Sequence, residues 1–327
     1  MARALMAALA PLGPVVVASE LRTLDMAGDA GVQAGLIATA RAEAARLVQV
    51  LPGDLRVWVT YHNYYKAPDL IGPAVCAARG IPYVQIESTR AKKRLSGAWA
   101  GFAAAAEAAS DAAAVIFYLT RRDGETLERD RVAGQRLVWL PPFLPVSELP
   151  AASTLAAGAP MLAAGMMRSG DKLASYRMIA EALALLDGAW SLEIAGDGPA
   201  RGEVAALLAP FGAGVRFLGQ LDAAEMAAAY GRAGLFLWPG VNEAFGMVYL
   251  EAQAAGLPVV AQDRPGVREV LASPGVPVAA GAWGLAEAVA ALGDPVRRAT
   301  VGAAGREFVG ARHLLGHATA VLAEGLA

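Results

Sequence analysis

The sequence has little cysteine, little histidine and few charges. Of its 327 residues one is cysteine and three are histidine, and Asp, Glu, Lys and Arg together make up 18%. The single cysteine, Cys76, excludes an intramolecular disulfide framework. The histidines form no recognisable zinc pattern. His313 and His317 are four residues apart on an expected helix, which makes a two-histidine site geometrically possible, but the sequence supplies no third ligand beside them.

An excess of basic charge and a long apolar run are also absent. The net charge is −2 and the isoelectric point is near 6.0, which gives no electrostatic footprint for nucleic acid. No run of about 18 apolar residues that could cross a membrane occurs, and the first residues lack the pattern of a signal peptide. We therefore expect a soluble, cytoplasmic protein. Its length is enough for about two domains with large cores.

The stretch from residue 235 to residue 260 has the clearest local pattern. Leu235 to Trp238 is a short apolar run that ends at a Pro-Gly turn. Gly246 to Ala255 is typical of a helix, because Gly256 and then Pro258 follow it. The next apolar run, from Pro258 to Ala261, completes a strand, loop, helix and strand. Units of this kind bind ligands at the carboxyl ends of their strands.

Two acidic residues mark that end of the unit. Glu243 lies in the loop and Glu251 lies on the helix, with seven residues between them. The first helical residues, Phe245, Gly246 and Met247, offer unpaired N–H groups to a phosphate. The carboxylates on either side can accept hydrogen bonds from hydroxyl groups. A nucleotide sugar, with phosphate in its middle and hydroxyls at both ends, fits this arrangement.

The two acids and their neighbours, Glu243-Ala-Phe-Gly and Glu251-Ala-x-Ala-x-Gly-x-Pro, resemble the signature of the family 4 (group 1) retaining glycosyltransferases. The resemblance implies an α/β fold of the GT-B architecture, in which two Rossmann-like domains with doubly wound parallel sheets face a cleft. It also implies that Glu243 lies by the donor sugar and that Glu251 bonds the ribose. Without the flanking residues, two such glutamates would more simply be solvated acids.

Basic residues follow the strand expected from Met161 to Ala164, which ends at Gly165. Lys172 lies near a helix amino terminus, where a cation is unfavourable unless an anion is present, and Arg168 carries donors suited to the same phosphate. In the family an Arg follows the glycine directly, whereas Met166 stands here. Gly219 belongs to a loop that resembles the one bordering the nucleotide base.

The amino-terminal half alternates helices and strands as a doubly wound domain does. We expect strands at Val15–Ala18, Arg56–Thr60, Tyr83–Ile86 and Ala114–Leu119, and helices at Ala2–Leu9, Ala30–Gln49, Asp69–Ala78 and Gly97–Ala109. His62 follows one strand end, and the resemblance implies a histidine near the donor there; the alternative is a merely structural loop histidine. Glu87 follows the next strand and is a candidate for approaching the acceptor.

Compared with the family, the chain opens on its first helix. The resemblance therefore implies that a first strand with its glycine-rich loop is missing, and a truncated sequence or a misplaced start codon is the preferred interpretation. We expect an amino-terminal, acceptor-side domain over residues 1–148. The carboxyl-terminal donor domain is expected over residues 149–327, with a last helix from about Gly305 to Leu322 that crosses back to the first domain.

One dense basic cluster occurs, at Arg90, Lys92, Lys93 and Arg94. Basic loops of this kind attract anionic headgroups, so peripheral contact with the inner membrane face is one interpretation. A solvated charge run is the other.

The sequence thus predicts a hexosyltransferase that moves a sugar from a UDP- or GDP-sugar to an acceptor hydroxyl with retention, in bacterial glycan or glycolipid synthesis. The acceptor would be a sugar or a lipid-linked sugar. Lys172, Arg168 and the helix amino terminus would stabilise the leaving diphosphate, with Glu243 and His62 at the sugar, and neither a metal ion nor a bound cofactor is expected. Two alternatives remain, a nucleotide-sugar epimerase of the same fold and a non-catalytic nucleotide-binding relic.

Overall fold

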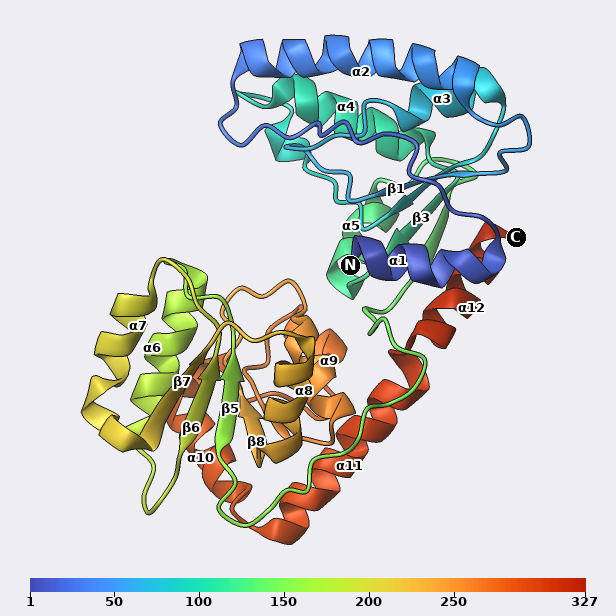
Figure 1. The fold of residues 1–327 in the computed structure, drawn as a ribbon. Helices are drawn as coiled ribbons and strands as arrows, with labels where there is room; N and C mark the ends of the chain where they lie inside the picture. The colour runs from blue at the N-terminus through green and yellow to red at the C-terminus, as the bar shows by residue number, and fades with distance from the viewer. The chain divides into compact units, whose positions relative to one another are not determined.

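The computed structural model describes residues 1–327 and divides them into two compact units (Figure 1). The first unit contains residues 1–141 together with residues 318–327, and the second contains residues 142–317. Each unit is built around its own parallel sheet. No helix in either unit is both long enough and apolar enough to span a membrane.

The sheet of the first unit has four parallel strands in the order β1-β2-β3-β4. Buried side chains of three helices, α3, α4 and α5, pack together on one face of this sheet. Helix α2 lies outside α3 and packs on it through Ala40, Ala44 and Leu47. The strands are β1 (Trp58–Tyr61), β2 (Tyr83–Ile86), β3 (Val115–Tyr118) and β4 (Arg136–Trp139), and the helices are α2 (Ala30–Val50), α3 (Gly72–Arg79), α4 (Ala100–Ala112) and α5 (Arg121–Arg129).

The strand expected at Val15–Ala18 does not form. Helix α1 (Ala2–Leu9) and a short 3₁₀ turn are followed by residues without regular structure up to residue 29. Val16 and Val17 are 62% and 63% exposed. Three valines favour a strand, but a strand needs a neighbour to bond with, and β1 at the sheet edge pairs with β2 alone. The prediction was wrong because local propensity does not supply a pairing partner.

The sheet of the second unit has five parallel strands in the order β7-β6-β5-β8-β9. The strands are β5 (Met161–Ala164), β6 (Leu192–Ala195), β7 (Val215–Gly219), β8 (Leu235–Leu237) and β9 (Val259–Val260), and the helices between and after them are α6 (Asp171–Leu183), α7 (Arg201–Leu208), α8 (Ala223–Arg232), α9 (Met247–Ala254) and α10 (Gly281–Ala291). The order reverses between β5 and β8, and the carboxyl edge at such a switch point is where doubly wound sheets bind ligands. The α/β fold with parallel sheets is as the sequence predicted.

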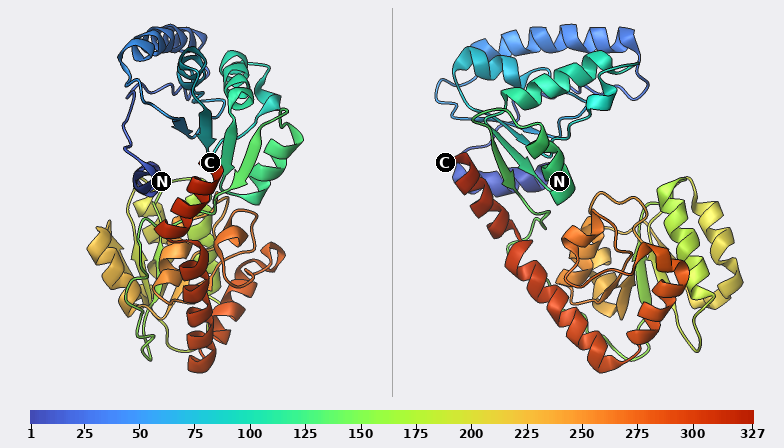
Figure 2. Two further views of the ribbon diagram at one scale, coloured as in Figure 1. Left: turned by 90° about the vertical axis from the view of Figure 1, so that its right-hand side faces the viewer. Right: turned by 180° about the vertical axis from the view of Figure 1, so that it is seen from behind.

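The single helix expected near the carboxyl terminus is two helices, α11 (Pro295–Arg312) and α12 (Leu315–Leu326). They separate at His313, whose carbonyl oxygen accepts the N–H of Leu144 at 2.8 Å. This bond takes the carbonyl out of the helical ladder, which explains the break. Helix α12 lies in the first unit from Ala318 onward. There Gly325 lies against the ring of Phe117, and Thr319 Oγ1 donates to the carbonyl of Ala8 at 3.0 Å. Figure 2 shows α12 beside α1.

Candidate functional site

Four loops meet at the carboxyl edge of the second sheet, after β5, β6, β8 and β9. Their backbones approach so closely that side chains are excluded at particular positions. A Cβ atom at Gly196 would overlap the carbonyl oxygen of Gly165, and one at Gly266 would overlap that of Ala244. Gly219 has a positive φ of 76° and accepts the N–H of Gly196 at 2.7 Å. Gly165 and Gly219, the last residue of β7, therefore both contact the loop after β6 at this edge.

Lys172 and Glu243 form an ion pair at the centre of this edge. Lys172 lies in the first turn of α6 and Glu243 in the loop after β8, and their side chains are only 18% and 15% exposed. The carboxylate also accepts a hydrogen bond from Trp238, with 3.0 Å between Nε1 and Oε1. The Lys172 ammonium lies 5.3 Å from the centroid of the Trp238 ring. The anion that offsets Lys172 at the helix terminus is thus Glu243.

Arg168 lies on the loop before α6. Its side chain is exposed and makes no hydrogen bond or ion pair within the chain, and its neighbour Met166 is 62% exposed. The loop after β8 is fixed to α6, because Asn242 Nδ2 donates to Asp171 Oδ2 at 2.9 Å and the N–H of Val241 donates to Ser175 Oγ at 3.1 Å. The guanidinium group of Arg168 is therefore free to bind an anion at the same edge.

The amino terminus of α9 has no cap. Gly246, its N-cap residue, contributes no side-chain hydrogen bond, and the first turn contains no acidic residue. The residues before it make the tight turn that brings Glu243 back to the helix start, with positive φ at Gly240 (74°), Asn242 (53°) and Gly246 (79°). Phe245, Gly246 and Met247 are half-buried. Their N–H groups have no acceptor in the chain, which suits an anion.

Glu251 lies on α9, one turn after Met247. Its Oε2 accepts a hydrogen bond from the Tyr230 hydroxyl at 2.8 Å. Tyr230 comes from α8 and is 5% exposed. Burial first, and then the charge and hydrogen bond of Glu251, raise the pKa of Tyr230 well above its usual range, so this hydroxyl stays protonated and donates. Sequence patterns alone do not identify Tyr230 or Trp238 as partners of the two glutamates, because their only signals are a tyrosine near a helix end and a tryptophan that follows a strand.

In the first unit, His62 and Glu87 follow β1 and β2. Both have left-handed backbones, with φ of 69° and 58°, which is uncommon for residues other than glycine. His62 Nδ1 lies 3.7 Å from Glu87 Oε1, and the His62 ring meets the ring of Tyr64 at 4.7 Å. Glu87 Oε2 is buried without a partner. An acceptor oxygen without a donor at the end of a strand is suited to a hydroxyl group of a ligand.

Asp123, at the start of α5, belongs to the same cluster. Burial, assisted by the charge of Glu87, raises the pKa of its carboxyl group. Thr120 caps α5 by accepting the N–H of Asp123 at 3.2 Å. The Thr-x-x-Asp spacing after β3 is the signal that could have identified this residue. His62, Glu87 and Asp123 thus bring three titratable side chains together at the carboxyl ends of β1, β2 and β3.

The basic cluster of the sequence is not one surface patch. Arg90 is an interior residue whose side chain is 2% exposed, and it pairs with Glu107 at 2.9 Å and with Asp111 at 2.7 Å. Lys92 pairs with Asp130 at 2.7 Å. The interpretation of Arg90 as a headgroup contact was therefore wrong, because two carboxylates of α4 hold its guanidinium group inside the unit.

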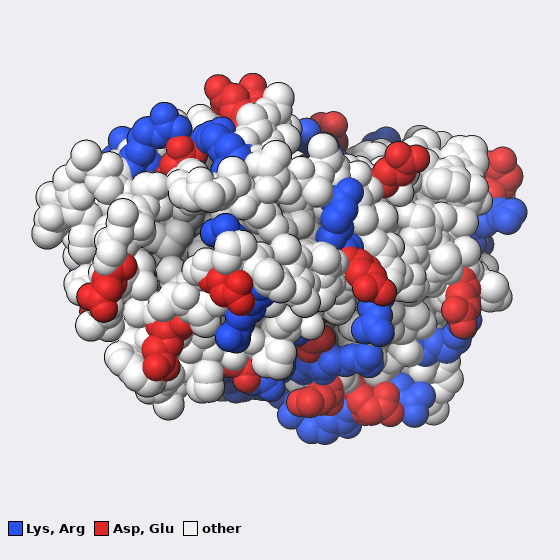
Figure 3. Space-filling model, turned by 90° about the horizontal axis from the view of Figure 1, so that it is seen from below, with Lys and Arg blue, Asp and Glu red and all other residues white.

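The two remaining basic residues of that loop differ in exposure. Lys93 is exposed, whereas Arg94 is half-buried and its Nε is buried. The Arg94 guanidinium lies 5.1 Å from the ring centroid of Tyr65 and 5.8 Å from that of Trp99. On the face drawn in Figure 3, acidic and basic side chains are interspersed over a largely uncharged surface. Charge of one sign does not gather into a broad field there.

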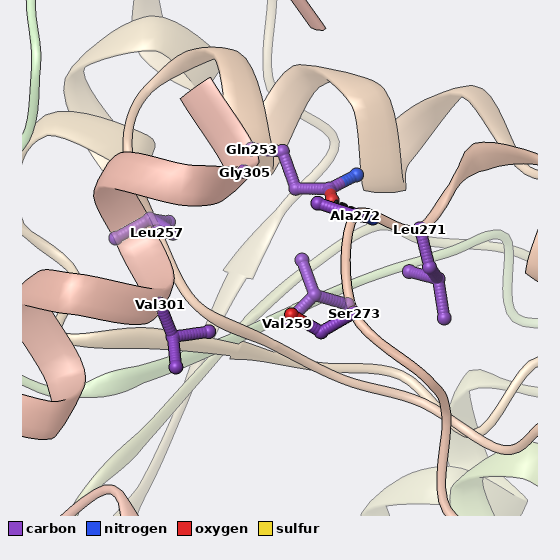
Figure 4. A pocket seen from close by; sticks show the side chains of 8 residues that line it. All are labelled: Gln253, Leu257, Val259, Leu271, Ala272, Ser273, Val301 and Gly305. Atoms are coloured by element: carbon purple, nitrogen blue, oxygen red, sulfur yellow. Dashed lines mark hydrogen bonds between the residues drawn. The ribbon is translucent and has the colours of Figure 1, made fainter. Parts of the chain in front are cut away.

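Two hollows in the second unit lie away from these residues. The one in Figure 4, between α9 and α11, measures only about 10 Å³ and has room for about one water molecule. The other is an open groove of about 760 Å³ beside Trp190 and Trp283, at the amino ends of β5, β6 and β8. The candidate residues lie at the opposite, carboxyl edge of these strands.

The histidines of the carboxyl-terminal region are not arranged as metal ligands. The chain contains no group of three or more His, Cys, Asp or Glu that could hold a metal ion. His313 is 1% exposed and its Nδ1 lies 2.6 Å from the carbonyl oxygen of Pro142. Its ring is therefore engaged with the backbone.

Part of the second unit resembles known proteins. Residues 161–294 match the family model "Glycosyl transferases group 1". A phosphatidyl-myo-inositol mannosyltransferase of Mycobacterium leprae is 46% identical over 100 residues, which are 29% of this chain and 27% of the relative. A GDP-mannose-dependent monoacylated alpha-(1-6)-phosphatidylinositol monomannoside mannosyltransferase of Corynebacterium glutamicum is 39% identical over 105 residues, 29% of this chain and 28% of the relative. The chain thus matches less than a third of each relative.

Solved structures resemble a larger part of the chain. The sucrose-phosphate synthase of Thermosynechococcus elongatus covers 90% of this chain, and 77% of that protein is matched, with a TM-score of 0.66 and 20% identity. HepE of Anabaena, solved with UDP and glucose, covers 87% of this chain, with 81% of HepE matched, a TM-score of 0.66 and 17% identity. At this identity the likeness establishes the fold, and it confirms the predicted GT-B architecture.

Proposed function

We propose, on the premise that residues 161–294 belong to the group 1 glycosyltransferases, that the protein transfers a hexose from a nucleoside diphosphate sugar to an acceptor hydroxyl. The observation that carries the proposal is the arrangement at the carboxyl edge of the second sheet. There one short stretch of chain, residues 243–251, contains both glutamates and the uncapped start of α9. Lys172 contacts this stretch through its ion pair with Glu243. The order of these groups matches the order of sugar, diphosphate and ribose in the donor.

The leaving diphosphate would lie at the amino terminus of α9. The free N–H groups of Gly246 and Met247 point their partial positive charge at such a ligand. Lys172 is already at this edge, and Arg168 has an unengaged guanidinium group close by in the chain. Fixed donors and cations of this kind stabilise charge that develops in the transition state. In this proposal side chains and backbone meet the charge of the leaving group, without a metal ion or a bound cofactor.

The two glutamates would bind the two ends of the donor. Glu243 has one oxygen engaged by Lys172 and Trp238, and its second oxygen has no partner in the chain. That oxygen would accept a hydroxyl of the donor sugar and face the positive charge that develops at its anomeric carbon. Glu251 likewise keeps Oε1 without a protein partner for the ribose. We propose transfer with retention, as the family resemblance implies.

The donor nucleotide would be UDP or GDP. The HepE structure was solved with UDP and glucose, and the Corynebacterium relative is GDP-mannose-dependent. The names of the Mycobacterium leprae and Corynebacterium glutamicum relatives say that both act on phosphatidylinositol derivatives. We propose a sugar or lipid-linked acceptor for this protein, bound in the first unit by His62 and Glu87.

A lipid-linked acceptor would require contact with an anionic surface. Lys92, Lys93 and Arg94 form a short basic 3₁₀ turn, followed by Leu95, which is 45% exposed. Such a loop can approach headgroups with its cations and place one apolar side chain at the interface. In this proposal the protein works in the cytoplasm, at the inner membrane face.

The direct test is product analysis. The protein is incubated with UDP-glucose, UDP-N-acetylglucosamine or GDP-mannose, each alone and with a membrane lipid extract, and the products are separated and examined by proton NMR. A new glycoside with the anomeric configuration of the donor is the expected result. Conversion of the donor sugar without an acceptor would instead identify an epimerase. Nucleotide binding without any turnover would favour a non-catalytic protein.

A further inference from the structure

Each of the two glutamates is held by an aromatic donor from the layer of buried side chains beneath the site. Trp238 Nε1 donates to Glu243 Oε1 at 3.0 Å, and the Tyr230 hydroxyl donates to Glu251 Oε2 at 2.8 Å. Trp238 is 0% exposed and Tyr230 is 5% exposed. In each pair one carboxylate oxygen is engaged from below, while the other keeps no partner in the chain.

Trp238 itself is fixed on several sides. Its ring packs edge to face on the ring of Tyr176, with 5.1 Å between the centroids and 76° between the planes. On another side a Cβ atom added at Gly165 would lie only 2.7 Å from the nearest atom of the Trp238 ring. The indole has a single N–H, which can donate in one direction only. Because the ring cannot turn, this N–H sets the direction of the Glu243 carboxylate. The same ring is 5.3 Å from the Lys172 ammonium, so Trp238 contacts both members of the ion pair.

Tyr230 is fixed in a comparable way. It lies at the end of α8, and its ring packs 6.1 Å from that of Phe236 on β8. A buried hydroxyl that faces a carboxylate can only donate, since the carboxylate has no proton to give. The bond therefore sets the rotamer of Glu251 on the exposed side of α9.

We infer that Trp238 and Tyr230 are positioning residues that act on opposite ends of the nucleotide sugar. Trp238 acts through Glu243 on sugar transfer, and Tyr230 acts through Glu251 on nucleoside binding. The inference rests on the proposed function. It adds that the two glutamates are held independently, by hydrogen-bond donors from two different elements. Loss of the Trp238 N–H should therefore change sugar transfer and leave nucleoside binding, and loss of the Tyr230 hydroxyl should do the reverse.

The experiment compares Trp238→Phe and Tyr230→Phe, each of which removes the hydrogen-bond donor of the side chain and keeps an aromatic ring. Binding of UDP, GDP and their 2′-deoxy forms is measured by titration calorimetry, and kcat and KM are measured for transfer. Tyr230→Phe should weaken binding of the ribonucleotide about tenfold, weaken that of the 2′-deoxy form less, and leave kcat within about twofold. Trp238→Phe should lower kcat at least about tenfold and leave nucleotide affinity within about twofold. A hydrogen bond to a charged group is of this size.

Two matched variants control for the loss of a buried group. Tyr83→Phe removes a buried hydroxyl in the first unit, and Trp190→Phe shortens a ring that packs on Phe211, away from the four loops. Both should leave affinity and kcat unchanged. A double-mutant cycle gives a second readout, because Tyr230→Phe should have no further effect on nucleotide affinity when Glu251 is already Ala.

The possible outcomes separate the inference from the proposed function. If the wild-type protein binds a nucleotide and transfers sugar, but both variants lower affinity and kcat together or lower neither, the division between Trp238 and Tyr230 is wrong while the function stands. An effect of Tyr230→Phe that persists in full in the Glu251→Ala background would also overturn it. If the wild-type protein binds none of the nucleotides, the proposed function fails first, and the inference with it.

Discussion

Lys172 and Glu243 lie 71 positions apart in the sequence and form an ion pair at the carboxyl edge of the second sheet. The ammonium group comes from the first turn of α6 and the carboxylate from the loop after β8. Both side chains are more buried than exposed, and Trp238 contacts both. Removing one partner would leave the other charge partly buried and uncompensated. The pair therefore links the stability of this edge with the binding role that we propose for it.

Lys172→Ala should weaken binding of nucleoside diphosphates about tenfold or more, and binding of the corresponding nucleosides much less. The reason is that the lost ammonium would interact with phosphate and not with the base or ribose. Titration calorimetry with UDP, GDP and their nucleosides measures the difference. Equal affinity of the wild-type and variant proteins for the diphosphates would show that Lys172 has no phosphate role.

Glu243→Ala should retain nucleotide binding and lose transfer, by a factor of about 100 or more for a group that acts mainly in the transition state. Glu243→Gln is the matched control for shape, because an amide oxygen can still accept from Trp238. Steady-state kinetics and nucleotide titration on both variants give the two readouts. A Glu243→Ala protein with full transfer activity would contradict the assignment.

Gly266→Ala should destabilise the second unit by about 1–3 kcal/mol, the usual cost of overpacking. The added methyl group would overlap the carbonyl oxygen of Ala244, which is backbone and cannot turn aside. Gly202→Ala on α7 is the control, since nothing lies within 4 Å of the added atom and alanine favours a helix. Urea unfolding of the two variants measures the difference, and equal midpoints would contradict the close approach of the loops.

His313 should make the protein less stable in mild acid. Burial, with smaller effects of the neighbouring cations, lowers the pKa of this histidine from 6.5 to about 4. The folded state therefore favours the neutral ring, and its contribution is complete above pH 6.5 and is lost as the pH falls toward 4. The contribution is on the order of 3 kcal/mol by the usual 1.36 kcal/mol per pKa unit.

The control for this prediction is His317→Gln, which changes an exposed histidine on α12. His313→Gln should flatten the pH dependence of the melting temperature between pH 4 and pH 6.5. His317→Gln should change it little, because it removes only a smaller contribution to the lowered pKa of His313. If the slope survives in His313→Gln, other groups carry the acid sensitivity.

Arg90 and Lys93 should differ in what their loss affects. Arg90→Met leaves Glu107 and Asp111 without their buried partner, so it should lower stability by about 3 kcal/mol. Lys93→Glu should leave the melting temperature unchanged and weaken binding to vesicles with anionic lipid, by about 1 kcal/mol for each unit of charge. Sedimentation with vesicles of phosphatidylcholine and phosphatidylglycerol tests the second effect. Equal binding of Lys93→Glu and wild-type protein would remove this loop as a membrane contact.

The sequence predicted the second unit best, because its strands are buried apolar runs between glycine or proline turns. The predicted bounds of Met161–Ala164 are those of β5. Glu243 and Glu251 could be placed at one edge for the same reason, since a loop and the helix after it are close in the chain. Local patterns were sufficient wherever the deciding contacts are local.

The remaining features depend on contacts between distant residues. Val15–Ala18 lacks a neighbouring strand, Arg90 is drawn inside by carboxylates on α4, and the break before α12 arises from a bond between His313 and Leu144. The hydrogen bond from Tyr230 to Glu251 joins two residues that lie 21 positions apart, on two different helices. None of these partners follows from periodicity or composition, since each depends on how separate elements pack.

The measurement that tests the central claim most directly is the thermal stability of the protein with UDP, GDP and ADP and with their glucose or mannose conjugates, compared with that of Glu251→Ala. A ligand at about 100 times its dissociation constant adds roughly 2.7 kcal/mol, which raises the melting temperature of a protein of this size by several degrees. We predict such a rise for one nucleotide and its sugar conjugate, and its loss in Glu251→Ala. No rise with any of these ligands, or an equal rise in the variant, would contradict a donor site at this edge of the sheet.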